Sequence, residues 1–112
     1  MILLLALQME AMRVAHPGSP IGAYQNCMAP IVLANERADK SSYQPLEKIL
    51  DRMKVQCAKQ RDRAADALVG QILYQNPDLS PPPTEQDKEQ LISSATNRWA
   101  NDLLAKMATE GE

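Results

Sequence analysis

Two cysteines are the residues of this sequence best able to form a covalent link, and their spacing pairs them. Cys27 and Cys57 flank residues 39–45, where small polar residues and a proline interrupt the apolar periodicity on both sides, as in a turn. Ser42 lies fifteen residues from each cysteine. If the flanking segments are antiparallel helices with the same rise per residue, these equal distances bring the cysteines level, at the roughly 5–6 Å between Cα atoms that a disulfide needs.

Each cysteine also lies on the apolar face of its own flank. Apolar residues recur at helical spacing before the turn at Tyr24, Cys27, Met28, Ile31 and Ala34, and after it at Leu46, Leu50, Met53, Cys57, Ala64 and Leu68. The pattern predicts a disulfide that closes a loop of about thirty residues, which stabilises the fold by roughly 3–4 kcal/mol in the chain-entropy model. The alternative is a pair of reduced, buried cysteines that act as small hydrophobic residues.

Other chemistry finds little support in the sequence. A structural zinc site needs about four Cys or His ligands, and beyond the two cysteines the chain adds only His16. Phosphate-binding glycine loops, zinc-protease motifs and nucleophile elbows are absent from the sequence. We therefore expect no catalytic residue, no metal and no cofactor.

A stripe of basic residues follows the turn, and it has two interpretations. It consists of Lys48, Arg52, Lys59 and Arg63, flanked by Glu47, Asp51, Asp62 and Asp66. It could bind phosphate or an acidic partner, but we favour a solvated helix face with ion pairs three or four residues apart, such as Arg63 with Asp66. A net charge of −2 also argues against nucleic acid as an obligatory partner.

The end of the same segment is apolar nearly all round and forms a second candidate surface. Its large side chains are Leu68, Val69, Ile72, Leu73 and Tyr74. A helix end of this kind must be covered on more than one side. Intramolecular packing is the simpler expectation, but we nominate these five residues as the contact surface for another protein.

These residues are positioned by elements that the sequence predicts to be helices throughout. We expect helices at residues 21–38, with a kink or a division into two segments at Pro30, and at residues 45–74, followed by a stiff Pro-rich linker at residues 76–83. Thr84 then caps a third helix, with Asp87 at the acidic position of a capping box. Its predicted core residues are Leu91, Ala95, Trp99, Leu103 and Met107, widened by Ile92 and Leu104. The expected fold is all-α: an antiparallel, disulfide-linked hairpin plus a C-terminal helix, in one domain at residues 20–112.

Residues 1–19 are either a signal-like segment or an N-terminal apolar segment. The apolar run at residues 1–7 resembles the core of a signal peptide, although it lacks a preceding basic residue and an Ala-x-Ala site. A Pro/Gly/Ser spacer and two cysteines follow, as in short exported proteins. The alternatives are an N-terminal helix that packs Leu4, Leu5, Met9 and Met12 onto the hairpin, or a true start further upstream. No aliphatic run approaches the roughly 18–20 residues of a membrane span.

Two short motifs, one around each cysteine, resemble those of other short proteins. The chain has Ala23-Tyr24-Gln25-Asn26-Cys27 before the polar turn and Cys57-Ala58-Lys59-Gln60-Arg61 after it. This pattern resembles short exported proteobacterial proteins with a two-cysteine helical hairpin and no assigned function. The resemblance covers roughly residues 20–75 and implies export and a disulfide, but no activity.

Together these features predict a small, non-enzymatic accessory protein of the periplasm or the exterior. It would bind another protein, as inhibitors, immunity proteins and chaperones do. The alternative is a cytoplasmic helical module that uses the basic stripe to bind nucleic acid or an acidic partner. A deep pocket lined by Tyr24, Tyr43 or Tyr74 together with a buried carboxylate would instead favour an enzyme.

Overall fold

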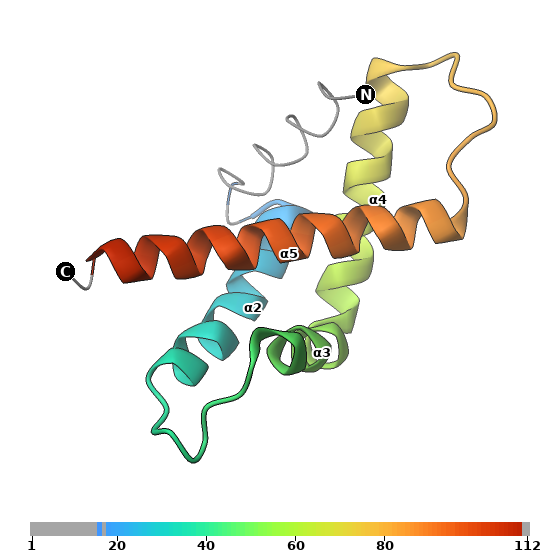
Figure 1. Ribbon diagram of the computed structural model, residues 1–112. Helices are drawn as coiled ribbons and strands as arrows, with labels where there is room; N and C mark the ends of the chain where they lie inside the picture. Colours follow the sequence, from blue (N-terminus) through green and yellow to red (C-terminus); the bar gives the residue numbers. More distant parts are fainter. Residues whose placement is uncertain (1–15, 17, 111–112) are drawn as a thin grey trace.

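The computed structural model describes residue 16 and residues 18–110, and this part of the chain is helical, with no strand among its elements (Figure 1). The helices are α2 (Pro20–Glu36), α3 (Leu46–Gln56), α4 (Ala58–Gln75) and α5 (Glu85–Glu110). The predicted all-α class, with a linked hairpin and a C-terminal helix, is confirmed. The signal-like reading of residues 1–19, and the alternative packing of Leu4, Leu5, Met9 and Met12, fall on positions that lie almost entirely outside the described residues.

Helix α2 begins where the sequence predicts, because Ser19 and Pro20 favour a helix start. The Ser19 hydroxyl accepts a hydrogen bond from the Gly22 N–H at 3.0 Å, and Pro20 is the first helical residue. Of the two alternatives at Pro30, the division into two segments is wrong, because α2 is one uninterrupted helix, and the kink stays a prediction. Pro30 removes the hydrogen bond to the carbonyl of Asn26, but both residues are exposed, so water can solvate that carbonyl.

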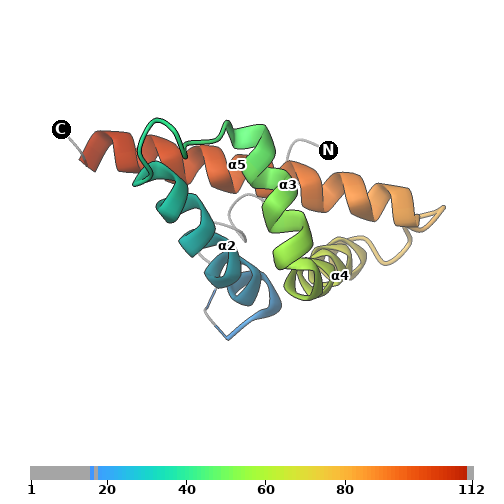
Figure 2. The ribbon, with the colours of Figure 1, turned by 90° about the horizontal axis from the view of Figure 1, so that it is seen from below.

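The predicted single helix at residues 45–74 is wrong, because the chain breaks at Cys57 into α3 and α4. Cys57 has φ −107° and ψ 25°, and the two helices run in clearly different directions (Figure 2). A straight helix of thirty residues would extend about 45 Å, whereas α2, with 17 residues, extends about 26 Å. Since α3 and α4 both contact α2, the bend lets both segments pack against this shorter helix.

The core draws on all four described helices and differs from the predicted stripes in two places. Its buried side chains are Ile21, Tyr24, Met28 and Val32 of α2, Ile49 and Met53 of α3, Cys57 at the junction between α3 and α4, Ala64, Ala65 and Leu68 of α4, and Ile92 and Ala95 of α5, with Ala100 also buried. On α3, Ile49 is buried where Leu46 and Leu50 were expected, and these two are only partly buried. On α5, the predicted Ile92 and Ala95 are buried, whereas the predicted Leu91 and Trp99 are only partly buried against the core.

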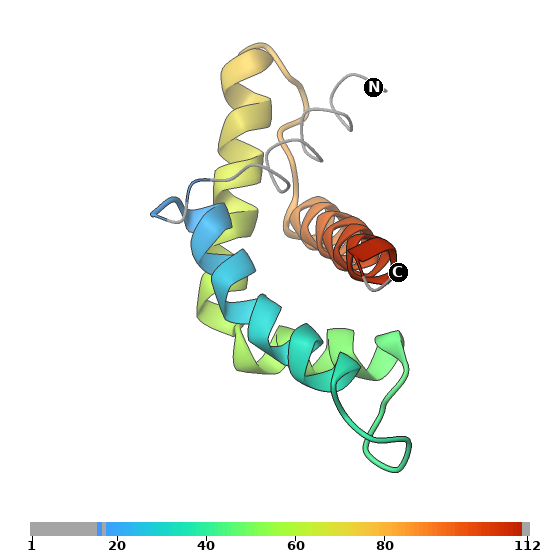
Figure 3. The ribbon, with the colours of Figure 1, turned by 90° about the vertical axis from the view of Figure 1, so that its left-hand side faces the viewer.

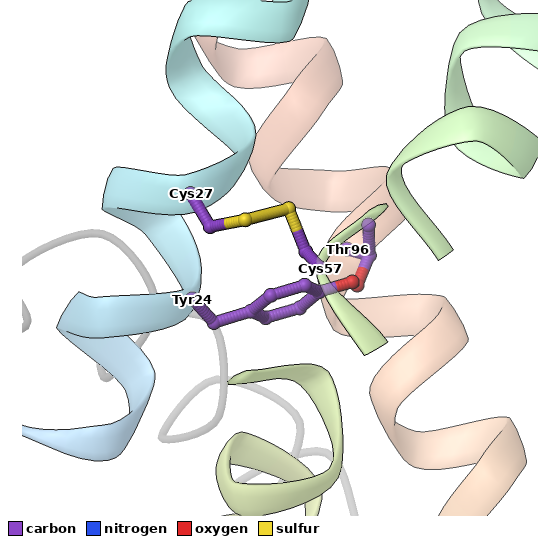
Figure 4. Close-up of a disulfide and its surroundings, with 4 residues drawn as sticks. All are labelled: Tyr24, Cys27, Cys57 and Thr96. Atoms are coloured by element: carbon purple, nitrogen blue, oxygen red, sulfur yellow. A yellow bond between two sulfur atoms is a disulfide. The ribbon is translucent and has the colours of Figure 1, made fainter. Parts of the chain in front are cut away.

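The Cys27–Cys57 disulfide joins α2 to the junction between α3 and α4 (Figure 4). The S–S distance is 2.08 Å and the two Cα atoms are 6.0 Å apart, within the usual range for a disulfide. Cys57 is fully buried and Cys27 packs against the core. The link closes a loop between residues thirty apart in sequence, and α5 lies outside this loop.

The two connections are held by side-chain hydrogen bonds. Asn35 fixes the turn between α2 and α3, because its side chain donates to the Gln44 carbonyl and accepts from the Gln44 N–H, both at 2.9 Å. After the Pro-rich linker, the predicted capping box is confirmed: the Thr84 N–H donates to the Asp87 carboxylate at 3.0 Å and the Asp87 N–H donates to the Thr84 hydroxyl at 3.1 Å.

Candidate functional site

A partly open pocket of about 150 Å³ lies where the four helices meet. Its lining combines hydroxyl, amide and charged groups with an apolar wall: Tyr24 of α2, Leu50, Asp51 and Lys54 of α3, Arg61 of α4, and Ser93, Thr96 and Asn97 of α5. This volume is smaller than that of most ligand pockets, which span roughly 300–1,000 Å³. The pocket is large enough for one side chain or a very small molecule.

Tyr24 forms the back of this pocket and links α2 to α5. Its ring is fully buried beside the disulfide, and its hydroxyl lies 2.9 Å from the Thr96 hydroxyl (Figure 4). Thr96 donates its one proton to the Ile92 carbonyl at 2.7 Å, so Tyr24 is the donor in the pair. Burial raises the pKa of the Tyr24 phenol above its ordinary value. The phenol therefore keeps its proton at neutral pH.

Arg61 and Glu89 link α4 to α5 next to this tyrosine. The Arg61 guanidinium donates to both Glu89 oxygens at 2.8 Å and to the Ser93 hydroxyl at 3.0 Å. Only 12% of the Arg61 side chain is exposed, so the pair is largely shielded on the arginine side. The hydrogen bonds from Arg61 are the main reason that the pKa of Glu89 falls to about 2, and the same contact raises the pKa of Arg61.

The chemistry of the pocket is that of a structural clamp. At neutral pH Glu89 holds its negative charge and Tyr24 holds its proton, so neither is poised to exchange protons as a general acid or base. Asp51, the carboxylate in the pocket lining, is exposed. Tyr43 and Tyr74 are exposed elsewhere. The pocket lined by Tyr24 thus lacks the buried carboxylate that would favour an enzyme, and the absence of enzymatic activity stays a prediction.

The basic stripe is divided by the bend at Cys57. Lys48 and Arg52 lie on α3, whereas Lys59 and Arg63 lie on α4, and all four are exposed. Because α3 and α4 diverge (Figure 2), the four side chains do not follow one straight helix face. Arg52 donates to the Gln44 side chain at 3.0 Å.

The carboxylate predicted to pair with Arg63 has a different partner. The Asp66 carboxylate lies 2.7 Å from the ammonium group of Lys88 on α5. This ion pair therefore joins two helices instead of stabilising one exposed face.

The five residues nominated as a contact surface differ widely in exposure. Leu68 belongs to the core, and Val69 and Ile72 are partly buried. Leu73 is 37% exposed and Tyr74 is 88% exposed.

Leu79 of the linker is a further exposed apolar residue, at 42%, which the sequence pattern did not indicate. We call Leu73, Tyr74 and Leu79 the apolar tip. Leu73 and Tyr74 belong to the last turn of α4, whose end lies beyond the level of α2 and α5, and Leu79 belongs to the linker that follows (Figures 1 and 3).

Sequence reasoning did not find the Arg61–Glu89 clamp. Arg61 stands in a motif to which the sequence gives no role, and Glu89 is one of three acidic residues in the first turns of α5, with Glu85 and Asp87, where acidic residues suit the helix dipole. The available signal was the spacing of Glu89 and Ser93, four residues apart and hence on one face of α5. That spacing identifies a polar face but does not say which basic residue of another helix meets it.

The fold and these sites define a small, disulfide-linked, all-α protein with a clamped polar pocket and an exposed apolar tip. The chain matches no protein-family model, and neither a curated protein nor a solved structure matches it. Over the described residues, no helix is long and apolar enough to cross a membrane. Within the same part of the chain, no group of three or more His, Cys, Asp or Glu residues is placed to hold a metal ion.

Proposed function

We propose that this chain is a small accessory protein of the periplasm or the exterior that acts by binding another protein. The observation that carries the proposal is the Cys27–Cys57 disulfide, because such links persist in oxidising compartments and are rare in the cytosol. In a short chain with a thin core, a link that ties α2 to the bend at Cys57 also supplies a large share of the stability.

Binding is favoured over catalysis by what the molecule leaves accessible. The polar groups at the back of the pocket are occupied by one another, through the pairs Tyr24–Thr96 and Arg61–Glu89. The apolar tip, in contrast, presents large side chains to solvent. Exposed apolar patches often mark sites of protein–protein interaction. Inhibitors, immunity proteins and chaperones are the classes that fit a protein of this size.

The compartment is tested by the intact mass of the protein recovered from its native host, with and without reduction and alkylation. We expect a mass that lacks the first ten to twenty residues, with Cys27 and Cys57 labelled only after reduction. A full-length mass with both thiols freely alkylated under denaturing conditions would overturn the proposed compartment. The cytoplasmic alternative, in which Lys48, Arg52, Lys59 and Arg63 bind an acidic partner, would then be the reading to pursue.

The binding role is tested by photo-crosslinking in the same host. A crosslinking amino acid at position 74 should give a discrete higher-mass adduct with a protein. The same amino acid at position 55 is the control, because Val55 is a similarly exposed apolar residue, 78% exposed, on α3. Equal adducts from both positions, or none from position 74, would contradict a binding role for the apolar tip.

A further inference from the structure

We infer that the apolar tip docks a segment of a partner protein in which lysine or arginine side chains flank apolar ones. The inference rests on the proposed function, because it identifies the chemistry of the protein that would be bound. It is argued from the exposure of the tip, from the way the chain holds it, and from the charge of its surroundings.

The side chains of the apolar tip are exposed to solvent. Tyr74 is 88% exposed, with Leu73 on the same helix and Leu79 in the linker contributing further apolar area. Gly70 lies one turn before Tyr74, and a methyl group added at its Cα would meet nothing within 4 Å, so a partner backbone can approach α4 there. Aromatic side chains at such sites are common binding anchors.

The chain also holds the tip in place before any partner arrives. The N–H and the side-chain amide of Asn76 both donate to the Ile72 carbonyl, at 2.9 and 3.2 Å, and so cap the end of α4. The Leu79 N–H then donates to the Asn76 carbonyl at 3.0 Å, which closes a turn and keeps Leu79 close to the helix end. A preformed surface loses less conformational entropy on binding than a flexible one.

Between Arg63 and Lys88, the chain that includes the tip carries acidic residues and no basic ones. Residues 64–87 contain four acidic residues and no lysine, arginine or histidine. Asp66 and Glu85 are partly offset by Lys88, at 2.7 and 3.8 Å. Asp78 lies in the linker between Tyr74 and Leu79 and directly precedes Leu79. Opposite charge on a partner steers encounter and suppresses wrong partners. Basic residues that flank apolar ones are therefore the complementary chemistry.

A second copy of the chain fits the tip less well. Stable dimers bury roughly 800 Å² on each subunit, which three partly exposed side chains fall short of supplying. A short partner segment needs less surface, and the proposal commits to it.

Two synthetic helical peptides of about fifteen residues test the inference on the full oxidised chain. In both peptides one face of the helix consists of leucine residues. The opposite face consists of lysine residues in the first peptide and of glutamate residues in the second. Binding is followed by NMR titration. The lysine peptide should bind at least about tenfold more tightly, should shift the resonances of Leu73, Tyr74 and Leu79, and should weaken as salt rises.

Variants locate the binding. Tyr74→Ser and Leu79→Ser change exposed residues, and each should reduce the affinity for the lysine peptide several-fold. Asp78→Lys should reduce the ratio of the affinity for the lysine peptide to the affinity for the glutamate peptide. Val55→Ser is the matched control, because it removes an equally exposed apolar side chain on α3, and it should leave the affinity unchanged.

Several results from the peptides, the variants and the crosslinking would overturn the inference. These are equal affinity for the two peptides, loss of binding in Val55→Ser to the same degree, self-association through the tip without peptide, and a crosslink from position 74 to residues 1–15. Self-association would identify a second copy of the chain as the partner of the apolar tip, and a crosslink to residues 1–15 would identify a segment of the same chain as its partner. The intact-mass measurement and the photo-crosslinking in the native host do not depend on the peptide titration. The proposed function and the basic partner can therefore fail separately. A protein adduct at position 74 whose contacting segment is acidic would keep the binding role and refute the basic partner.

Discussion

Replacing Glu89 with glutamine tests whether the clamp to Arg61 contributes to stability in the way that its geometry indicates. The change keeps the shape of the side chain and removes its charge, so the largely buried guanidinium loses its charged acceptor. A pKa of about 2 in the folded protein, against an ordinary value of 4.5, corresponds to roughly 3.5 kcal/mol at about 1.4 kcal/mol per pH unit. Most of this comes from Arg61, and the Lys54 ammonium, 3.3 Å from the Glu89 carboxylate, supplies a smaller part. Because 46% of the Glu89 side chain is exposed, solvent screening reduces this figure, and we expect a loss of about 1.5 kcal/mol at pH 7.

The pH dependence gives the sharper test. The pKa of Glu89 is lower in the folded than in the unfolded protein, so its contribution is complete above about pH 5 and is lost as the pH falls from 4.5 towards 2. The difference in free energy of unfolding between the native protein and Glu89→Gln should therefore shrink over that interval and approach zero near pH 2. Comparing the two proteins at each pH cancels the titration of the other carboxylates.

The assay is urea denaturation followed by circular dichroism, with the disulfide intact. Glu85→Gln is the matched control, because Glu85 lies one turn earlier on α5, is 93% exposed and is 3.8 Å from its nearest cation. It should change the free energy of unfolding by less than about 0.5 kcal/mol. A Glu89→Gln protein within about 0.3 kcal/mol of the native one at pH 7, or a difference that persists at pH 2, would refute the reasoning.

Three further changes have expected outcomes on the same urea assay. Replacing Cys27 and Cys57 together with alanine should cost roughly 3–4 kcal/mol, and a loss below about 1 kcal/mol would mean that the link adds little to the packed core. Tyr24→Phe should cost about 1 kcal/mol, because it removes one buried hydrogen bond but leaves the ring in place, and an unchanged midpoint would contradict that bond. Asn35→Ala should cost about 1–2 kcal/mol through the turn that it fixes, whereas a neutral result would show that the turn holds without it.

The features that the sequence predicted correctly depend on residues that are close in the chain. The cap at Ser19, the capping box at Thr84 and the ends of the linker follow from local hydrogen-bonding rules. The disulfide is a long-range feature, but its prediction needed only equal distances from one turn. Cys57 ends α3 and precedes α4, and it lies level with Cys27 even though the segment after the turn is not one helix.

The bend at Cys57 could not be predicted, because no local signal marks it. Residues 46–69 contain no proline and no glycine, and their apolar spacing fits a continuous helix. The chain bends because burial of Ile49 and Met53 alongside Ala64 and Leu68 in one core outweighs the interruption of the regular helix at this point. Cys57 itself keeps two helical hydrogen bonds, since its N–H donates to the Met53 carbonyl and its carbonyl accepts from the Arg61 N–H, both at 2.8 Å. A compact core is a property of the whole chain, and helix propensity is only a weak guide against it.

The apolar face of α5 was largely predicted, because Ile92 and Ala95 are buried and Leu91, Trp99, Leu103 and Leu104 pack against the core, but Thr96 and Ala100 were missed for a geometric reason. The predicted residues recur every four positions, and an α-helix has 3.6 residues per turn, so such a row drifts around the helix by about 40° at each step. The buried side chains of the structure include Ile92, Ala95 and Ala100, with Thr96 also buried, which mixes shorter and longer steps. Thr96 is polar, so a search for apolar residues overlooked the partner of Tyr24.

The position of the disulfide has a consequence for how the molecule opens. The link spans residues 27–57, so it holds α2 against the bend but places no covalent limit on α5. Hydrogen exchange should therefore show two levels of protection, with α5 able to detach in a partial opening that the hairpin survives. Trp99, the one tryptophan of the chain, lies on α5, and its fluorescence would report this step. Such an opening would carry Thr96 away and uncover Tyr24 and Arg61, which turns the closed clamp into a transiently accessible polar face.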